Sequence, residues 1–269
     1  MGKSCRIVLR TYAKLNLCLD VLNKRPDGYH DIDSLFQNIS LFDEMEVLFV
    51  DGTGRIFIES NVQIEDNIIE KAWKKVCFSK KDVFVKLKKN IPIGGGLGGG
   101  SSNAAGFIVA LEKTGILDKN DTENIAAMVG SDVLFFIHGG SAIVNGRGEI
   151  IKSVEPLRNF RVNLYFPNFS VSTKQAYEKL KPEWFGKAPM KSTQLYEAYR
   201  LNDFEMIKNG SYNIFEKVIP KVVFEKIKEL RKHYPAALTG SGSTYFSVNE
   251  EGKFSFVEKG VEIYAFEKG

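Results

Sequence analysis

A run of glycines followed by two serines is the part of this sequence with the clearest chemistry. Residues 91–106 read IPIGGGLGGGSSNAAG, with six glycines in the seven positions from Gly94 to Gly100. Such a turn lets backbone N–H groups surround an anion, and a helix that follows adds its unpaired N–H groups and its positive dipole end. We therefore expect this stretch to bind nucleotide phosphates, with Ser101 and Ser102 offering hydroxyls to a phosphate or its Mg²⁺.

Two common phosphate-binding patterns do not fit this loop. The Walker A pattern requires a lysine after the last glycine, but residues 101–103 are Ser-Ser-Asn. A dinucleotide-binding turn follows the first strand of a βαβ unit, and here several predicted strands come earlier. A flexible linker is the plain alternative, although linkers rarely separate two packed elements.

A second polar group lies near the N-terminus. Residues 13–21, AKLNLCLDV, alternate apolar and polar side chains, which predicts a half-buried strand with Lys14 and Asn16 on the face opposite the apolar one. Further along the chain Asp132 lies between two helical patterns. Taken alone, single charged residues such as Lys14 and Asp132 are most often solvated surface residues.

The elements that must position these groups follow from hydrophobic periodicity. Strands are predicted first and helices are clustered later, an order that favours an α+β architecture. The division between two domains is predicted at 1–155 and 156–269. Asp43 and Glu44 are expected on a solvated turn. The predicted strands are 5–10, 13–21, 45–50, 55–59, 83–89, 141–146, 161–166, 244–248 and 261–266; the predicted helices are 67–76, one starting near 101, 121–128 ending at Gly130, and most of 172–232.

Composition narrows the class of protein. The chain has 269 residues, 43% hydrophobic and 26% charged, with a net charge of +4, which suits an anionic small molecule. Its lysines are too dispersed to indicate nucleic acid. Cys5, Cys18 and Cys77 are odd in number and lack C-x-x-C spacing, so we expect no disulfide framework, no metal held by protein ligands, and a cytoplasmic location.

No long apolar stretch or leader is evident in the chain. The apolar runs fall short of the roughly 18 residues of a membrane span, and the first residues lack the features of a signal peptide. We expect no membrane partner, and a monomer or weak homodimer.

Three motifs together resemble those of the GHMP kinases (galactokinase, homoserine kinase, mevalonate kinase and phosphomevalonate kinase). The glycine loop resembles their ATP loop. Their P-A-K-x-N motif is matched by residues 12–16, with Tyr12 replacing proline, and their G-A-D-V-P motif by residues 130–134, which keep the aspartate. The resemblance extends from Tyr12 to about Val248, and it implies a ribosomal-S5-like N-terminal domain followed by a ferredoxin-like C-terminal domain.

The resemblance assigns catalysis to Lys14 and Asp132. Asp132 would hydrogen-bond the acceptor hydroxyl, orient it and take its proton, while Lys14 would keep Asp132 ionised and offset charge on the transferring group. Asn16 would help hold the acceptor. A carboxylate suffices as the base because the transition state of phosphoryl transfer is loose. Catalysis then depends mainly on positioning the reactants and on neutralising the charge of the transferring group.

The resemblance also implies an ATP site around the glycine loop. Asn67, which is equally a good N-cap, and Lys89 would lie near adenine and its ribose. The loop itself would contribute Pro92, Ile93, Gly94, Gly95, Gly96, Leu97, Gly98, Gly99, Gly100, Ser101, Ser102 and Asn103.

The acceptor is indicated by Arg25 to His30, which read R-P-D-G-Y-H. Pro-Asp-Gly is ordinary turn chemistry, but the whole segment resembles the cytidine-binding segment of GHMP kinases whose acceptor carries a cytidine diphosphate. Tyr29 would stack on cytosine and His30 would read the edge of the base. The same resemblance adds Thr173, Tyr177 on the second face of the base, and Gly240, Ser241 and Gly242 in a C-terminal glycine loop.

The function expected from these motifs is ATP-dependent phosphorylation of a hydroxyl on a small molecule that carries cytidine diphosphate, with Mg²⁺ bridging the ATP phosphates. Three alternatives stay open. Another GHMP kinase, of the homoserine or mevalonate type, would make residues 25–30 a plain turn. A nicotinamide-dependent oxidoreductase would need an early βαβ unit. A nucleotide-binding protein without activity would have no use for Lys14 and Asp132.

Overall fold

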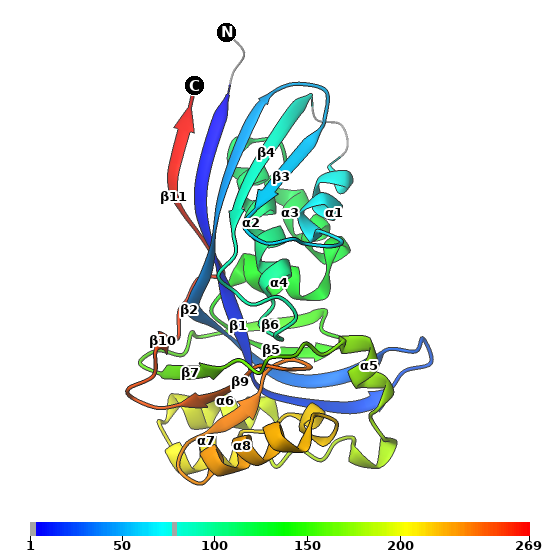
Figure 1. Ribbon diagram of the computed structural model, residues 1–269, viewed down its shortest axis with the longest axis vertical. Helices are drawn as coiled ribbons and strands as arrows, with labels where there is room; N and C mark the ends of the chain where they lie inside the picture. The colour runs from blue at the N-terminus through cyan, green and yellow to red at the C-terminus, as the bar shows by residue number, and fades with distance from the viewer. Residues whose placement is uncertain (1–3, 77–79) are drawn as a thin grey trace.

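The first half of the chain and the C-terminal strand build a seven-stranded sheet in the computed structural model, which describes residues 4–76 and 80–269. Cys77 lies outside the described residues. The strand order is β11-β1-β2-β4-β3, and β5 continues from β2 and carries β6 (Figure 1). The strands are β1 (Cys5–Lys24), β2 (His30–Asp51), β3 (Ile56–Ser60), β4 (Lys81–Lys88), β5 (Ser141–Gly146), β6 (Ile150–Val154) and β11 (Val261–Lys268).

A long hairpin of β1 and β2 forms the centre of the larger sheet. These strands pair antiparallel from Cys5↔Phe49 to Lys24↔His30. Sequence periodicity predicted a half-buried strand at 13–21, but every residue there is buried on both faces. The difference arises because segments from both halves of the chain cover the face that carries Lys14 and Asn16: residues 97–98 and 132 lie at Lys14, and residues 239–240 lie at Asn16. Asp43, expected on a solvated turn, lies inside β2 and is fully buried.

Four helices cover one face of this sheet (Figure 1). α2 begins after Gly98, whose φ of 71° favours glycine, and ends at Gly115, which has a similar φ of 75°. α3 stops at Gly130, as its sequence predicted. The helices are α1 (Ile68–Lys75), α2 (Gly99–Thr114), α3 (Lys119–Val129) and α4 (Ser131–His138).

The second half builds a smaller antiparallel sheet of order β10-β7-β9-β8, with α6, α7 and α8 packed below it in Figure 1. Its apolar side chains form a second core with part of β1. The strands are β7 (Arg161–Tyr165), β8 (Ala236–Leu238), β9 (Tyr245–Val248) and β10 (Phe254–Ser255). The helices are α5 (Thr173–Glu178), α6 (Ser192–Arg200), α7 (Phe204–Gly210) and α8 (Lys221–Arg231), with 3₁₀ turns η1 (Pro182–Trp184) and η2 (Ile214–Lys217).

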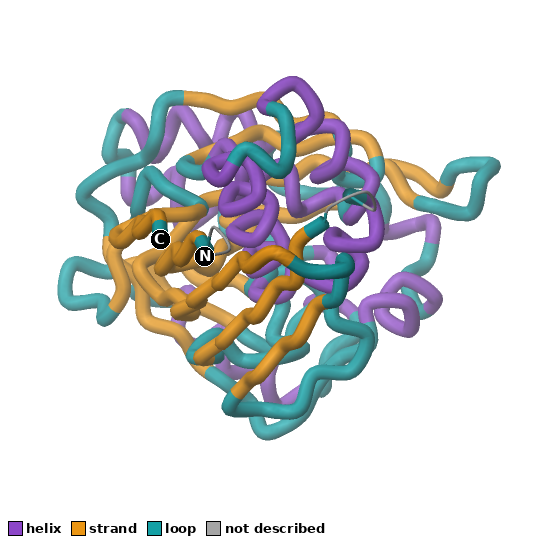
Figure 2. The backbone as a smooth tube through the Cα atoms, turned by 90° about the horizontal axis from the view of Figure 1, so that it is seen from above, coloured by secondary structure: helices purple, strands orange, loops and turns teal. Residues whose placement is uncertain are grey.

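The chain returns to its starting sheet at the end. β11 pairs antiparallel with β1, and the N–H of Gly269 donates to the carbonyl oxygen of Ser4 at 2.9 Å. The view from above in Figure 2 shows these two ends side by side among the strands. The α+β prediction is confirmed. Across the described residues, no helix has the length and apolar character needed to cross a membrane.

Candidate active site

Lys14 and Asp132 meet at the junction of the two sheets. Lys14 Nζ lies 3.8 Å from Asp132 Oδ2, and the aspartate lies in the first turn of α4, where the helix dipole places further positive charge. Lys14 is 4% exposed, and burial lowers the pKa of its ammonium while Asp132 opposes that shift. Asp132 retains a side-chain exposure of 31%. A buried cation thus supports a carboxylate that a ligand can reach.

Asn16 connects this pair to the C-terminal glycine loop. Its Oδ1 accepts from Lys14 Nζ at 2.5 Å and from the N–H of Gly240 at 3.0 Å, and its Nδ2 donates to Ser34 Oγ at 3.0 Å. The N–H of Asn16 donates to Thr239 Oγ1 at 3.1 Å. With its amide engaged on both sides, Asn16 is placed to hold the loop and the lysine.

The two glycine loops pack on each other and on β1. The N–H of Lys14 donates to the carbonyl oxygen of Leu97 at 3.0 Å. A Cβ on Gly96 would lie 2.2 Å from the carbonyl oxygen of Thr239, and a Cβ on Gly98 would lie 2.7 Å from Phe136 Cζ. Side chains are therefore excluded here by backbone and ring contacts as well as by any phosphate.

A cavity of about 300 Å³ opens over the N-terminus of α2. All but one of the residues predicted to bind ATP line it, from Asn67 and Lys89 through the loop. The exception is Ser102, which is fully buried and whose Oγ donates to the carbonyl oxygen of Tyr12 at 2.6 Å. Ser102 therefore anchors the helix to β1, and Ser101 is the serine that faces the cavity.

Lys89 and Asn103 belong to a buried network behind the loop. Lys89 Nζ pairs with Asp43 and donates to Asn103 Oδ1 at 3.0 Å, and Asn103 Nδ2 donates to Asp43 Oδ2 at 2.9 Å. Asp43 Oδ1 also accepts from the backbone N–H of Ile91 at 2.8 Å. The sequence interpretation missed this network because nothing near Asp43 identified its partners.

Aromatic side chains gather around His30. The His30 ring stacks on Tyr177, with ring centroids 4.9 Å apart and planes 25° apart, and meets Phe185 edge-on at 5.8 Å. Burial, followed by the charge of Lys24, lowers the pKa of His30. Burial, followed by the charge of Asp132, raises the pKa of Tyr177 to about 12. The side chain of Tyr177 therefore lies within electrostatic range of Asp132.

The other predicted substrate residues lie on either side of this cluster. Tyr29 is 56% exposed at the tip of the β1–β2 hairpin and lies under the guanidinium of Arg147. Thr173 Oγ1 lies 2.9 Å from Ser241 Oγ, so the start of α5 contacts the C-terminal glycine loop. Asn213 Nδ2 holds that loop by donating to the carbonyl oxygens of Leu238 and Gly240.

Several residues of the site carried no recognisable sequence signal. Phe185 follows a short 3₁₀ turn and reaches His30 only through the tertiary fold. Ile64, Asp66 and Ile68 line the cavity beside Asn67, and the Oδ1 of Asn67 caps α1 by accepting from the N–H of Ile69. The apolar side chains of Ile64 and Ile68 are suited to packing against the face of an adenine ring.

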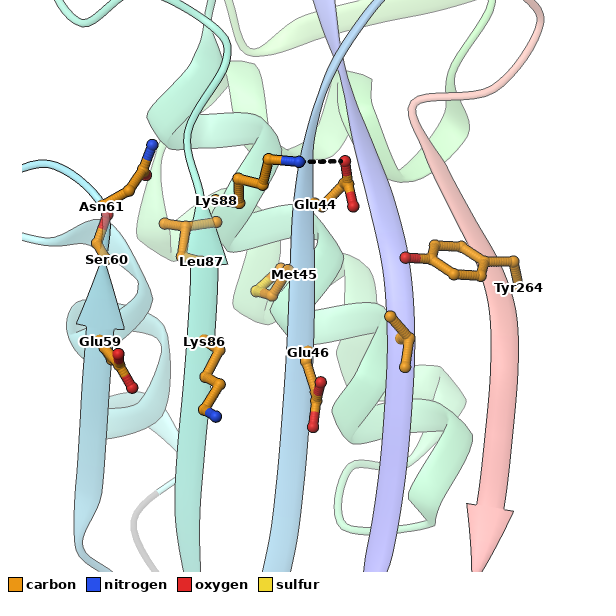
Figure 3. Close-up of a pocket in the computed structure, with 11 residues that line it drawn as sticks. Glu44, Met45, Glu46, Glu59, Ser60, Asn61, Lys86, Leu87, Lys88 and Tyr264 are labelled. Atoms are coloured by element: carbon orange, nitrogen blue, oxygen red, sulfur yellow. Dashed lines mark hydrogen bonds and ion pairs between the residues drawn. The ribbon is translucent and has the colours of Figure 1, made fainter.

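A larger groove, of about 480 Å³, lies on the sheet face away from the helices (Figure 3). It is lined by residues of β1, β2, β3, β4 and β11, among them the ion pair of Lys88 and Glu44 at 3.2 Å. It shares no lining residue with the cavity at the glycine loop, and no residue predicted to bind or react lies in it.

Comparison with known proteins identifies relatives along the whole chain. The family model described as the GHMP kinases N terminal domain matches residues 67–140. A 4-diphosphocytidyl-2-C-methyl-D-erythritol kinase of Fervidobacterium nodosum is 65% identical over 100% of both chains, and one of Thermotoga maritima is 44% identical over 93% of this chain and 95% of its own.

Solved structures agree with these relatives. The crystal structure of a 4-(cytidine 5'-diphospho)-2C-methyl-D-erythritol kinase superposes with a TM-score of 0.78 at 29% identity, covering 91% of each chain. A homoserine kinase from Cytophaga hutchinsonii, at 16% identity and a TM-score of 0.69, shares the fold. These findings confirm the predicted GHMP kinase fold. The chain belongs to the 4-diphosphocytidyl-2-C-methyl-D-erythritol kinases, a family of GHMP kinases.

Proposed function

We propose that this chain transfers the γ-phosphoryl group of ATP to the 2-hydroxyl of 4-diphosphocytidyl-2-C-methyl-D-erythritol, in non-mevalonate isoprenoid precursor biosynthesis. The relatives' names give the acceptor. Family membership at 65% identity over the full chain favours this acceptor over those of the homoserine and mevalonate type. The motifs at Lys14, Asp132 and the glycine loop supply the residues for the chemistry.

Asp132 is proposed to receive the acceptor hydroxyl. Its carboxylate is partly exposed at the start of α4, so it can accept a hydrogen bond from the hydroxyl, aim its oxygen at the γ-phosphorus and take its proton as the new P–O bond forms. Lys14, 3.8 Å away, opposes the negative charge that gathers on the carboxylate and the transferring group. This division of labour suits a loose transition state.

The ATP phosphates are proposed to lie against the N–H groups of the loop at the head of α2, where the cavity opens. The residues present fit Mg²⁺ bound mainly through those phosphates, because Mg²⁺ keeps several waters and needs few protein ligands. Ser101, which faces the cavity, is the hydroxyl available to it. Bound there, Mg²⁺ would neutralise phosphate charge. Ile64 and Ile68 are proposed to cover adenine.

The cytosine is proposed to bind at the aromatic cluster. Tyr29 and Tyr177 offer ring faces, and His30 is held neutral by its lowered pKa, so one ring nitrogen accepts and the other donates. The observation that carries the proposal is that Lys14 Nζ lies 3.8 Å from Asp132 Oδ2 while the N–H of Lys14 hydrogen-bonds the glycine loop at Leu97, so the acid–base pair lies beside the ATP loop.

A coupled ADP-release assay tests the proposal with Mg-ATP and four acceptors: the cytidine compound, mevalonate, homoserine and galactose. We expect turnover with the cytidine compound alone. Turnover with another acceptor would keep the assignments of Lys14 and Asp132 and discard the cytosine pocket. The absence of ADP release with all four acceptors would favour a nucleotide-binding protein without kinase activity.

Three further assignments accompany this function. We propose a monomer or weak homodimer without nucleic-acid or membrane partners, located in the cytoplasm. We also propose the division into residues 1–155 and 156–269, with β11 rejoining the first sheet.

A further inference from the structure

Two aspartates on the β1–β2 hairpin have no part in the proposed chemistry. Asp20 and Asp33 lie directly opposite each other on these antiparallel strands, and Asp20 is 3% exposed. Like charges in that position are unfavourable. Among the residues that the structure describes, no basic side chain lies within ion-pair distance of either carboxylate. Other groups must therefore stabilise the two carboxylates.

Those groups belong mainly to residues 186–192, which join η1 to α6 and which we call the strap. Asp20 Oδ2 accepts from the N–H of Ala188 at 2.9 Å. Beside it, the N–H of Gly186 donates to the carbonyl oxygen of Val21 at 2.9 Å. Hydrogen bonds to an ionised carboxylate are stronger than those between neutral groups. Asp20 thus binds the first half of the strap to β1.

Asp33 holds the other end of the strap. Its Oδ2 accepts from the N–H of Ser192 at 3.0 Å, and its Oδ1 accepts from the hydroxyl of the same serine. Ser192 is the first residue of α6, so the carboxylate also lies at the positive end of that helix. Asn145 Nδ2 donates to Asp33 Oδ1 at 3.2 Å. The strap is therefore bound to both strands of the hairpin.

The strap continues directly from Phe185, which meets the His30 ring edge-on with centroids 5.8 Å apart. Phe185 belongs to no strand or helix, and its N–H donates to the carbonyl oxygen of Pro182 at 3.1 Å. Its backbone is therefore held on one side by the 3₁₀ turn and on the other by the strap. His30 itself begins β2, three residues before Asp33.

We propose that Asp20 and Asp33 are positioning residues for the acceptor, because they bind the strap to the hairpin and so hold Phe185 beside His30. The inference rests on the proposed function. Neither carboxylate has to touch the ligand, since both are engaged by the strap. Loss of either one should weaken binding of the acceptor and leave ATP binding and the Lys14–Asp132 pair unchanged.

Steady-state kinetics of Asp20→Asn and Asp33→Asn test this role. An amide keeps the size of the carboxylate but can accept from only one of the two donor sites. We expect each variant to raise KM for the cytidine substrate about fivefold or more, with KM for ATP and kcat changed less than about twofold. Asp82→Asn is the matched control: Asp82 also accepts backbone N–H groups, from Thr53 and Arg55, but at the end of β4 far from the glycine loop.

Limited trypsin digestion of the full-length proteins measures the strap itself. Lys187 and Lys191 are exposed within it. Asp20→Asn and Asp33→Asn should be cut after these lysines faster than wild type and faster than Asp82→Asn, because local opening governs cleavage of a folded protein. Equal cleavage of all four proteins would overturn the proposal.

The variant Phe185→Ala separates positioning from a general loss of structure. If Asp20 acts through Phe185, Asp20→Asn should raise KM little further in the Phe185→Ala background. Multiplied effects of the two substitutions would overturn the proposal, as would equal rises of KM for both substrates. Wild-type protein that fails to bind CDP in a calorimetric titration would overturn the base pocket itself, and the role of the two aspartates with it.

Discussion

The ammonium of Lys14 lies 3.8 Å from the carboxylate of Asp132 although the two residues come from β1 and α4, on different layers of the fold. The lysine is buried, and among the residues that the structure describes its other polar side-chain partner is the amide oxygen of Asn16. A Phe36 ring 4.3 Å from Nζ adds a weaker attraction. Asp132 is therefore the anion that compensates this buried cation, and the exposed edge of the pair is where we propose that the phosphoryl transfer takes place.

Asp132→Asn should lower kcat by about 10²–10⁴-fold, because the amide keeps the shape but cannot take the proton. ATP affinity should change little, since the glycine loop binds the phosphates. Steady-state kinetics and ATP titration measure the two effects. Asp121→Asn, an exposed carboxylate in the first turn of α3, is the matched control and should leave kcat unchanged. Near-normal turnover of Asp132→Asn would remove this residue from the mechanism.

Tyr29→Ala should raise KM for the cytidine substrate about tenfold or more, because stacking on a base contributes about 1–3 kcal/mol. KM for ATP should stay the same. Tyr264→Ala controls for loss of an exposed tyrosine beneath an arginine, because Tyr264 is 50% exposed and contacts Arg10. If Tyr29→Ala raises both KM values equally, the stacking assignment is wrong.

KM for the cytidine substrate should be flat above pH 6.5 and should rise as pH falls through the pKa of His30. Burial and Lys24 place that pKa below 6.5 in the folded protein, so the neutral ring prevails at neutral pH. Because the folded state binds this proton less tightly than the unfolded chain, the stability contributed by neutral His30 is also present above pH 6.5 and lost as pH falls through the folded pKa.

Two variants check which group causes this rise in KM at low pH, which we call the acid limb of the profile. Lys24→Gln removes a charge that lowers the pKa of His30, so it should move the limb to higher pH. His30→Gln should raise KM and abolish the limb. An acid limb of the same midpoint in all three proteins would assign it to another group.

Asp43→Asn should destabilise the fold by about 3–5 kcal/mol, because it leaves the Lys89 ammonium buried without its counter-charge. The adjacent Glu44→Gln is the matched control: Glu44 pairs with Lys88 on the exposed face, and its loss should cost less than about 1 kcal/mol. Urea unfolding of both variants measures the difference. Equal and small effects would contradict the buried network.

Local patterns predicted the elements that depend on local residues. The end of α3 at Gly130 and the glycine loop before α2 were readable because glycine makes turns that other residues avoid. Most predicted strands also appear, for example 45–50 within β2 and 161–166 at β7. The Lys14 and Asn16 face was predicted correctly as a shared face, but its burial was not, because that burial comes from segments distant in sequence: residues 97–98 and 132 at Lys14, and residues 239–240 at Asn16.

Contacts between distant segments account for what the sequence did not reveal. Asp43 was predicted to lie on a solvated turn. In the fold, Lys89 at the end of β4 and Asn103 of α2 contact it. Ser102 resembled Ser101 in the motif, but the proximity of β1 commits its hydroxyl to Tyr12. The His30–Tyr177 stack and the Arg147–Tyr29 contact likewise depend on how α5 and the β5–β6 turn approach the hairpin.

The most direct test of the account is a ³¹P NMR spectrum of the reaction of purified protein with Mg-ATP and 4-diphosphocytidyl-2-C-methyl-D-erythritol. The account predicts ADP together with a new phosphomonoester on the acceptor, whose diphosphate stays intact. ADP with inorganic phosphate alone, or an unchanged acceptor, would contradict it.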